Sequence, residues 1–148
     1  MTAKKVNWGV ISCANIADKA VIPGIIGAQN AKLYAVSSRS REKAKEFKTK
    51  HHAEKAYDSY NMLLDDPDID AVYIPLPNAL HKEWVLKAAE KGKHILCEKP
   101  LGINAQEVLD MKAACEKYNV KLMEAFAYRH SPLTHKAKER AGRQRNSR

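Results

Sequence analysis

The sequence lacks the features of a membrane-spanning, secreted or disulfide-linked protein. No uncharged apolar run approaches the ~20 residues that cross a bilayer, and no apolar segment of a secretory signal follows the first two lysines. The three cysteines, Cys13, Cys97 and Cys115, include no CxxC pair. These absences argue against a zinc or disulfide framework. They predict a reduced, cytoplasmic protein of one domain that binds neither metal nor membrane.

Acidic residues are too few to balance the basic ones, and the formal net charge is +9. The excess is concentrated at the end of the chain, where residues 134–148 carry six lysines and arginines and one glutamate. Such a segment binds polyanions weakly or is merely a solvated end. Because residues 1–133 carry only +4, the charge does not indicate a nucleic-acid-binding face, and no nucleic-acid partner is expected.

Short apolar segments alternate with helical ones along most of the chain. Strands are expected at residues 6–11, 31–38, 71–74, 94–97 and 121–125. Helices are expected at residues 15–28, 41–50, 58–64, 80–91 and 104–118. Short, nearly all-apolar strands that alternate with helices are typical of a parallel sheet covered on both faces. The sequence therefore predicts an α/β fold with a doubly wound, mostly parallel sheet of the Rossmann type.

Local signals predict where several helices begin and end. Asp58 is the expected N-cap of the helix at 58–64, and Asn104 with Glu107 resembles a capping box. Gly92 is expected to end the helix at 80–91 in a left-handed conformation. Pro23 must kink or end the first helix.

Glycine is missing from the turn where a dinucleotide-binding fold usually has it. The turn from the first strand into the first helix reads SCANIA, residues 12–17, and Ser12, Ala14 and Ala17 occupy the glycine positions of GxGxxG. These small residues still let a pyrophosphate approach the backbone and the helix N–H groups. Ser12 and Ala14 adopt positive φ less readily than glycine, so an ordinary strand-to-helix turn is the alternative.

The end of the second strand lacks the acid that NAD enzymes usually place there. Ser37, Ser38, Arg39 and Ser40 occupy this position, and Lys43 follows at the start of the next helix. Hydroxyls and a guanidinium suit a 2′-phosphate, so NADP is preferred over NAD. The alternative is that Arg39 and Lys43 belong to a solvated helix start.

Two closely spaced prolines follow the strand at 71–74. Pro75, Leu76, Pro77 and Asn78 form an extended, stiff segment at the carboxyl edge of the predicted sheet, suited to line a flat cofactor. His81, which begins the next helix, is equally well explained as a functional residue or as a packing histidine.

The strand at 94–97 runs directly into Glu98, Lys99 and Pro100. One explanation is a surface turn; the other is that the end of a parallel strand carries working groups. Pro100 disfavours the α conformation at Lys99.

Taken together, these segments resemble the Gfo/Idh/MocA family of glucose–fructose oxidoreductase and inositol dehydrogenase. The resemblance is carried by SCANIA, by YIPLPNALHKEWVLKAAEKGKHILCEKPL at residues 73–101 and by MEAFAYRHSP at residues 123–132, and it runs from about residue 6 to about residue 136. Within that family the chain is most similar to the NADP-linked sugar and dihydrodiol dehydrogenases.

The resemblance implies a role for each matching residue. The pyrophosphate turn would be Ser12, Cys13, Ala14, Asn15 and Ile16, and the adenosine end would be held by Ser38, Arg39 and Lys43. The central stretch of the cofactor would lie against Leu76, Pro77, Asn78 and His81. Glu98 would contact the nicotinamide-side ribose, Lys99 would be the catalytic residue at the substrate oxygen, and Arg129 would close the nicotinamide side.

The resemblance also implies a domain organisation and an activity. Residues 1–126 would form the NAD(P)-binding Rossmann domain, and residues 127–148 would be the start of, or a remnant before, an antiparallel α+β domain absent from this chain. In the family that domain binds substrate, mediates oligomerisation and supplies a histidine that acts with the lysine.

The expected function is hydride transfer between NADP and a sugar, polyol or related secondary alcohol. We expect a homo-oligomer in a full-length form and incomplete activity in this fragment. A non-catalytic NADP-binding sensor or scaffold and a nucleic-acid binder acting through the basic end are the alternatives.

Overall fold

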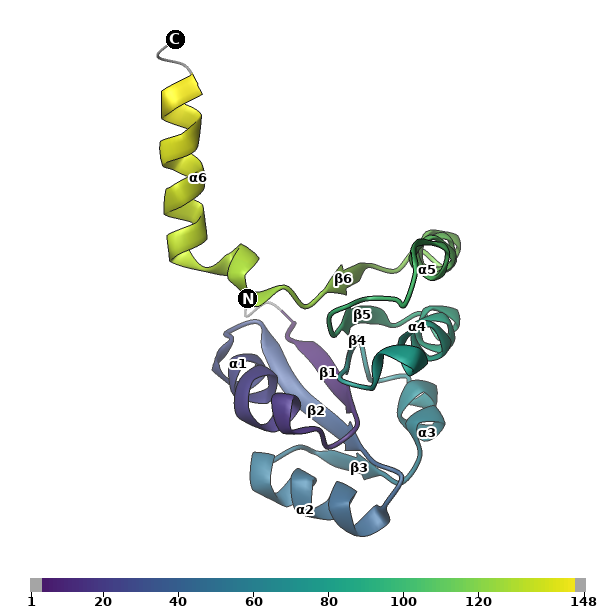
Figure 1. Cartoon of the computed structure of the whole chain (residues 1–148). Helices are drawn as coiled ribbons and strands as arrows, with labels where there is room; N and C mark the ends of the chain where they lie inside the picture. The colour runs from purple at the N-terminus through teal and green to yellow at the C-terminus, as the bar shows by residue number, and fades with distance from the viewer. Residues whose placement is uncertain (1–3, 146–148) are drawn as a thin grey trace.

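Six strands form one sheet in the computed structural model, which describes residues 4–145 and the side chains of residues 4–140. The strands are β1 (Val6–Ile11), β2 (Ala31–Ser37), β3 (Lys55–Tyr57), β4 (Ala71–Ile74), β5 (His94–Cys97) and β6 (Leu122–Glu124). Their order across the sheet is β3-β2-β1-β4-β5-β6, and every neighbouring pair is parallel (Figure 1). The predicted Rossmann sheet is confirmed.

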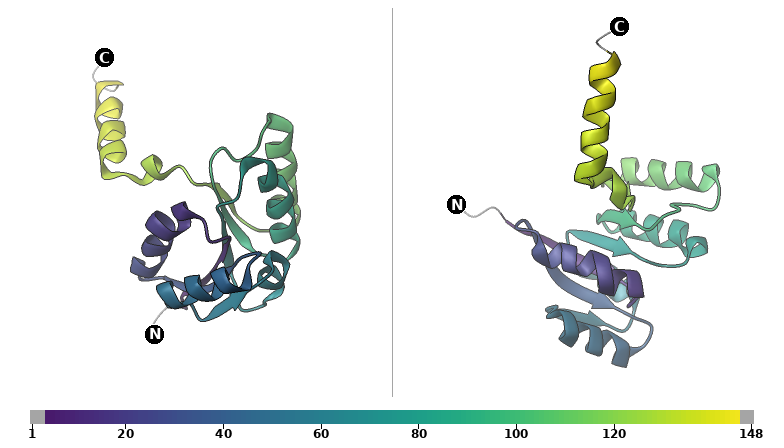
Figure 2. Two further views of the ribbon diagram at one scale, coloured as in Figure 1. Left: turned by 60° about the horizontal axis from the view of Figure 1, so that its bottom comes forward. Right: turned by 60° about the vertical axis from the view of Figure 1, so that its left-hand side comes forward.

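Helices cover both faces of this sheet. The main ones are η1 (Ala17–Val21), α1 (Ile22–Gly27), α2 (Arg41–His51), α3 (Tyr60–Asp65), α4 (His81–Glu90) and α5 (Ala105–Lys117). One apolar cluster joins η1 and α1 to β1 and β2, with Phe47 of α2 packed against it; the other joins the sheet to α3, α4 and α5. Figures 1 and 2 show α1 and α2 on one side and α3, α4 and α5 on the other. The sheet is therefore doubly wound, as expected.

The chain changes direction across the sheet between β3 and β4. Strands β1, β2 and β3 follow one another outward, and the chain then returns through α3 to place β4 on the other side of β1. Because all strands are parallel, their carboxyl ends share one edge. Open α/β sheets bind ligands outside that edge at the point where the strand order reverses, here between β1 and β4.

The first helical segment continues past Pro23 without a break, because the hydrogen-bonding pattern changes from π-helical to α-helical just before this proline. Residues Ala17–Val21 form a π-helical turn, and Pro23 then occupies the start of α1, where a missing N–H is tolerated. The expected kink is thus a change of helix type.

Two of the predicted helix boundaries are confirmed and one is displaced. The Asn104 side chain accepts the Glu107 N–H at 2.9 Å, and Gly92 has φ +69°. Ser59, not Asp58, caps α3, since its hydroxyl accepts the Asn61 N–H at 3.2 Å.

One strand and one long helix were not expected. Strand β3 has only three residues, which is too short for an apolar pattern to emerge. Helix α6 (Pro132–Arg145) includes much of the segment expected to be a basic tail, and it points away from the sheet in Figures 1 and 2. Leu133 in its first turn is 78% exposed. Within residues 4–145 no helix is long and apolar enough to cross a membrane.

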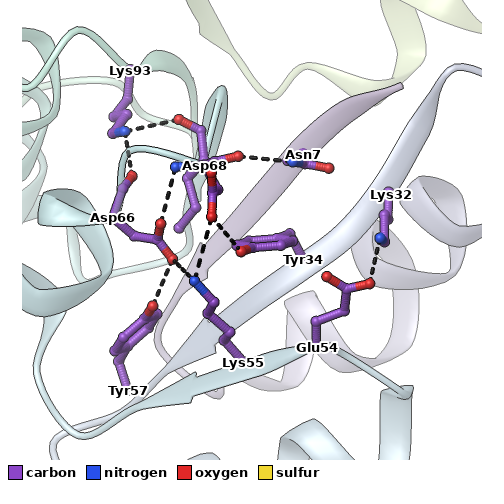
Figure 3. Close-up of polar contacts among 10 residues, drawn as sticks. Asn7, Lys32, Tyr34, Glu54, Lys55, Tyr57, Asp66, Asp68 and Lys93 are labelled. Atoms are coloured by element: carbon purple, nitrogen blue, oxygen red, sulfur yellow. Dashed lines mark hydrogen bonds and ion pairs between the residues drawn. The ribbon is translucent and has the colours of Figure 1, made fainter. Parts of the chain in front are cut away.

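A polar network around the segment before β4 joins it to the starts of β1, β3 and β5 (Figure 3). The side chains of Tyr34 and Tyr57 reach this network from farther along β2 and β3. Its centre is the buried Asp66 carboxylate, which accepts hydrogen bonds from Tyr57 Oη at 2.6 Å, Lys55 Nζ at 2.9 Å and the Asp68 N–H at 3.0 Å. Burial by itself would raise the pKa of Asp66, but the Tyr57 and Lys55 hydrogen bonds hold it below its usual range. Tyr34 donates to the Asp68 carboxylate at 2.9 Å.

A buried lysine extends the network to the start of β5. Lys93 is 5% exposed, and its ammonium donates to the carbonyl oxygens of Asp66 at 2.6 Å and Ile69 at 2.8 Å. Asn7, at the start of β1, donates to the Asp68 carbonyl at 2.8 Å. We call this set the amino-edge network: Asn7, Tyr34, Lys55, Tyr57, Asp66, Asp68 and Lys93.

Candidate functional site

The residues predicted to bind a cofactor follow the carboxyl ends of five strands. Residues 12–16 follow β1, residues 38–39 follow β2, residues 76–78 follow β4, residues 98–99 follow β5, and Arg129 follows β6. Parallel strands lie about 4.8 Å apart, so the turns after β1 and β5, with β4 between them, are about 10 Å apart. The fold therefore brings these segments to one edge, at the reversal of strand order.

The turn after β1 has the backbone geometry of a glycine turn without the glycine. Ser12 has φ +95°, and its N–H donates to the Ser37 carbonyl oxygen at 3.0 Å. The Ala14 carbonyl oxygen accepts the Asp18 N–H at 3.1 Å, and Asn15 and Ile16 are exposed at the helix start. Small side chains and a helix N-terminus leave the backbone N–H groups open to a phosphate.

Cys13 packs behind this turn. Its Sγ lies 3.8 Å from the Ser37 carbonyl oxygen and 3.7 Å from the Lys43 carbonyl oxygen. Burial raises the pKa of the Cys13 thiol, which therefore stays neutral. Cys13 thus offers a ligand its backbone, while its side chain links the first turn to the end of β2 and the start of α2.

The end of β2 presents two exposed cations. The Ser40 hydroxyl caps α2 by accepting the Lys43 N–H at 3.3 Å, and it donates to the Glu42 carboxylate at 2.9 Å. Ser38 is almost fully buried, and its Oγ accepts the Ser40 N–H at 3.2 Å. Arg39 and Lys43 are exposed, and neither pairs with an acid among residues 4–140. These positive charges are available to an anion.

The segment after β4 presents only part of what was expected. Pro75 and Leu76 are buried, whereas Pro77 and Asn78 are exposed, and Asn78 opens the short helix η2 (Asn78–Leu80). The exposed surface available to a cofactor is therefore Pro77 and Asn78, with Leu76 packed beneath them.

His81 differs from the expectation that it lines the cofactor. Its side chain is fully buried, and both ring nitrogens face carbonyl oxygens: Nε2 lies 2.8 Å from that of Leu76, and Nδ1 lies 3.0 Å from that of Pro100. A ring with no exposed surface does not contact a ligand outside the protein. His81 instead joins the segment after β4 to the turn after β5.

The turn after β5 exposes Lys99 and holds Glu98. The Lys99–Pro100 peptide bond is cis, and Lys99 is exposed. The Glu98 carboxylate accepts the hydroxyl of Tyr73 at 2.6 Å on Oε1 and the Lys99 N–H at 3.2 Å on Oε2. Because each carboxylate oxygen has two lone pairs, Glu98 retains acceptor capacity for a ribose hydroxyl.

Tyr73 was not expected to have a role in the site. Its ring is fully buried in β4, and burial together with the Glu98 carboxylate raises the pKa of its hydroxyl, so Tyr73 remains a hydrogen-bond donor. The available signal was a lone phenol in an otherwise apolar strand, because a buried tyrosine hydroxyl usually has a partner. Glu124, at the end of β6, was also missed; its carboxylate accepts the Leu101 N–H at 2.9 Å.

Arg129 lies in the short helix η3 (Ala127–His130), five residues after the end of β6. It is exposed, and its N–H donates to the Phe126 carbonyl oxygen at 3.1 Å. The guanidinium is paired with no acid among residues 4–140, so Arg129 adds a further free positive charge beyond the carboxyl edge.

A six-stranded parallel sheet with this strand order, a small-residue turn at its point of reversal and cations at the end of its second strand defines an NAD(P)-binding Rossmann domain. The chain belongs to the oxidoreductase family with an NAD-binding Rossmann fold (GFO_IDH_MocA), whose model matches residues 6–126. This is the Gfo/Idh/MocA family that the sequence resembles.

Individual relatives carry the names of dehydrogenases and reductases. Over 132 residues the chain is 44% identical to the D-xylose 1-dehydrogenase (NADP(+)) 2 of Haloferax volcanii. The aligned region covers 89% of this chain and 40% of that protein. It is 41% identical over 127 residues to the trans-1,2-dihydrobenzene-1,2-diol dehydrogenase of Xenopus tropicalis, which covers 85% of this chain and 38% of that protein.

A solved structure shows the same fold with a cofactor bound. The 3-ketoreductase KijD10 of Actinomadura kijaniata, in complex with TDP-benzene and NADP, matches with a TM-score of 0.89 and 32% identity, over 95% of this chain and 44% of that one. The chain thus spans about two-fifths of the length of these relatives.

Proposed function

We propose that this chain is the cofactor-binding half of an NADP-dependent dehydrogenase that acts on a sugar, polyol or related secondary alcohol. The observation that carries the proposal is the placement of the small-residue turn after β1 and the Glu98–Lys99 turn after β5 on one edge of the sheet, about 10 Å apart. A bound dinucleotide would lie along that edge, with its pyrophosphate at residues 12–16 and its nicotinamide end towards Lys99.

The preference for NADP is supported by the free charges at the end of β2. Arg39 and Lys43 would bind the 2′-phosphate. The end of β2 carries no Asp or Glu of the kind that binds the ribose hydroxyls of NAD. The Haloferax relative has NADP in its name, and the KijD10 structure contains NADP. Residues Ser12, Cys13, Ala14, Asn15 and Ile16 would hold the pyrophosphate.

At the other end of the cofactor, Lys99 would act as the general acid and base for the substrate oxygen. NADPH, when bound, supplies the hydride. Lys99 would donate a proton to the oxygen of the carbonyl group being reduced, and in the oxidative direction it would accept the proton of the alcohol. Glu98 would bind the nicotinamide-side ribose, while Pro77 and Asn78 would contact the cofactor between its ends and Arg129 would close the nicotinamide side.

The remaining assignments are part of the same proposal. We place the boundary of the cofactor domain near residue 126, where the family match ends. A carbohydrate-like substrate and a homo-oligomer in a longer form follow from the family resemblance. A reducing, cytoplasmic location is supported by three free cysteines, two of them buried.

The cofactor assignment is tested by fluorescence titration of the chain with NADPH and NADH. We expect tighter binding of NADPH and, in Arg39→Ala, a loss of about tenfold in NADPH affinity with little change for NADH. Arg140→Ala, which removes the same charge from exposed α6, is the matched control and should bind like the unaltered chain. Tighter binding of NADH would overturn the role of Arg39 and Lys43.

The catalytic assignment is tested by Lys99→Ala in a form that carries the second domain. NADPH affinity should stay within about twofold, while alcohol-dependent NADPH production should fall about 100-fold or more. A sensor or scaffold would show no alcohol-dependent NADPH production in the unaltered form either, which would contradict the enzyme assignment.

A further inference from the structure

The backbone of the turn that carries Lys99 is held by side chains from other elements. Its Leu101 N–H donates to the Glu124 carboxylate at 2.9 Å, and its Pro100 carbonyl oxygen faces the buried ring of His81 at 3.0 Å. Pro100 has no N–H. The N–H groups of Glu98, Lys99 and Leu101 are therefore all paired, and the Leu101 N–H is paired with a residue 23 positions away.

Glu124 is itself firmly placed. It is the last residue of β6, in register with Cys97 of β5, and the following Ala125 N–H donates to the Cys97 carbonyl oxygen at 2.8 Å. Its side chain is half-buried, and it forms no ion pair with a lysine or arginine among the described side chains. The hydrogen bond to Leu101 is thus the main contact of a carboxylate presented by a rigid strand end.

The placement of Glu124 brings two carboxylates to the same turn. Glu98 lies at its start and Glu124 beside its end, and both act on the buried thiol of Cys97. Burial, then Glu98, then Glu124 raise the pKa of Cys97 to about 12. Each carboxylate accepts a backbone N–H of the turn, Glu98 that of Lys99 and Glu124 that of Leu101. A hydrogen bond from a backbone N–H to a carboxylate is stronger than a bond between neutral groups.

We propose that Glu124 is a positioning residue for Lys99: by holding the Leu101 N–H, it fixes the turn and so directs the lysine amine towards the cofactor edge. The inference rests on the proposed role of Lys99. Lys99 lies only two residues from the point that Glu124 holds, and its own side chain has no partner within residues 4–140 to orient it. Its direction is therefore set by the backbone.

The test compares Glu124→Ala, which removes the acceptor, with Glu124→Gln, which retains an oxygen that accepts the Leu101 N–H. Glu124→Leu fills the same space without an acceptor and replaces the alanine variant should that variant fail to fold. Glu116→Ala, on the exposed side of α5, is the matched control. All are made in the 148-residue chain.

The first measurement is hydrogen exchange of backbone amides by NMR. In Glu124→Ala the Leu101 amide should exchange about tenfold faster or more, while amides of β1 and β4 keep their rates. Glu124→Gln and Glu116→Ala should exchange like the unaltered chain. An unchanged Leu101 rate in the alanine and leucine variants would overturn the proposal.

The second measurement separates the two ends of the cofactor. Because Glu98, which we propose binds the nicotinamide-side ribose, begins the same turn, Glu124→Ala should weaken NADPH binding about threefold to tenfold, an effect that loss of the Lys99 amine alone would not have. It should leave adenosine 2′,5′-bisphosphate, which lacks the nicotinamide half, unaffected. Glu124→Gln should restore NADPH binding. Equal losses for both ligands, or a glutamine variant as weak as the alanine one, would contradict a local effect on the Lys99 turn.

The two proposals fail in different ways. A chain that binds no NADPH contradicts the proposed function, whereas the exchange of the Leu101 amide is measured without cofactor. Normal NADPH binding with a Leu101 amide that is indifferent to Glu124 contradicts only the positioning role.

Discussion

Charged side chains lie at both edges of the sheet, but among the described residues they are paired within the protein at the amino edge, whereas the cations at the carboxyl edge are unpaired. At the amino edge, the Asp66 carboxylate has three donors, and the buried Lys93 ammonium donates to two carbonyl oxygens. At the carboxyl edge, Arg39, Lys43 and Lys99 are exposed and form no ion pair within the described residues. The contrast runs along the same six strands, from one end to the other.

The difference shows how one sheet divides stability from function. A buried charge whose partners are all within the protein contributes to the folded state, and losing one partner leaves the other uncompensated. An exposed cation without a partner adds little to folding and keeps its charge for a ligand. The amino edge therefore holds the strands together, and the carboxyl edge is left free to bind.

The largest expected effect is the loss of Asp66. Asp66→Ala removes the acceptor shared by Tyr57, Lys55 and the Asp68 N–H, and it should lower the free energy of unfolding by about 3 kcal/mol in urea titrations. NADPH affinity of the folded fraction should not change. The mirror variant, Lys99→Ala, should change the unfolding free energy by no more than about 0.5 kcal/mol. Similar losses from both variants would remove the distinction between the edges.

A smaller effect is expected on acidification. The pKa of Asp66 is lower in the folded chain than in the unfolded one, so below about pH 4 the unfolded state takes up the proton first. The stability that Asp66 provides is therefore present above that pH and is lost as the pH falls through the folded pKa.

Asp66→Asn, which does not titrate, is the comparison that isolates this effect. The difference in unfolding free energy between the unaltered chain and the variant should shrink between about pH 6 and pH 3 in urea titrations. A constant difference over that range would mean that Asp66 is not the group responsible.

The smallest expected effect lies at the carboxyl edge. Ser12 has φ +95°, a region that glycine adopts without strain, so Ser12→Gly should raise the unfolding free energy by about 0.5–1 kcal/mol. Ala14→Gly is the control: φ of Ala14 is not positive, and this change should lower stability by a similar amount. Thermal unfolding followed by circular dichroism measures both, and a destabilised Ser12→Gly would refute strain at this turn.

Much of the fold follows from local pattern. The apolar runs that became β1, β2, β4 and β5 are each four to seven residues long and are separated by helical segments, which is enough to predict a doubly wound sheet. Strand β3 was missed because three residues with one lysine carry no periodicity. Asp58 and Ser59 are both good N-caps, and only the backbone shows that Ser59 has the role.

The placement of the candidate site was predictable where it depends on residue type and position in sequence, as in the turns at residues 12–16 and 98–100. It was not predictable where it depends on contacts between distant residues. His81 contacts Leu76 and Pro100 through the core, and Glu124 reaches a turn 23 residues earlier. Such pairs exist only once strand order is known.

The position of Lys99 just after β5, at the same edge of the sheet as the turn after β1, has a wider consequence. The backbone of Lys99 and the turn after β1 follow strands of one sheet, so their spacing does not depend on any segment that follows β6. A following domain that binds substrate would then meet an edge whose two ends are already fixed relative to each other. Relatives named for xylose, dihydrodiol and deoxysugar substrates each match this chain over about two-fifths of their length, so the matched part is common to proteins with different named substrates.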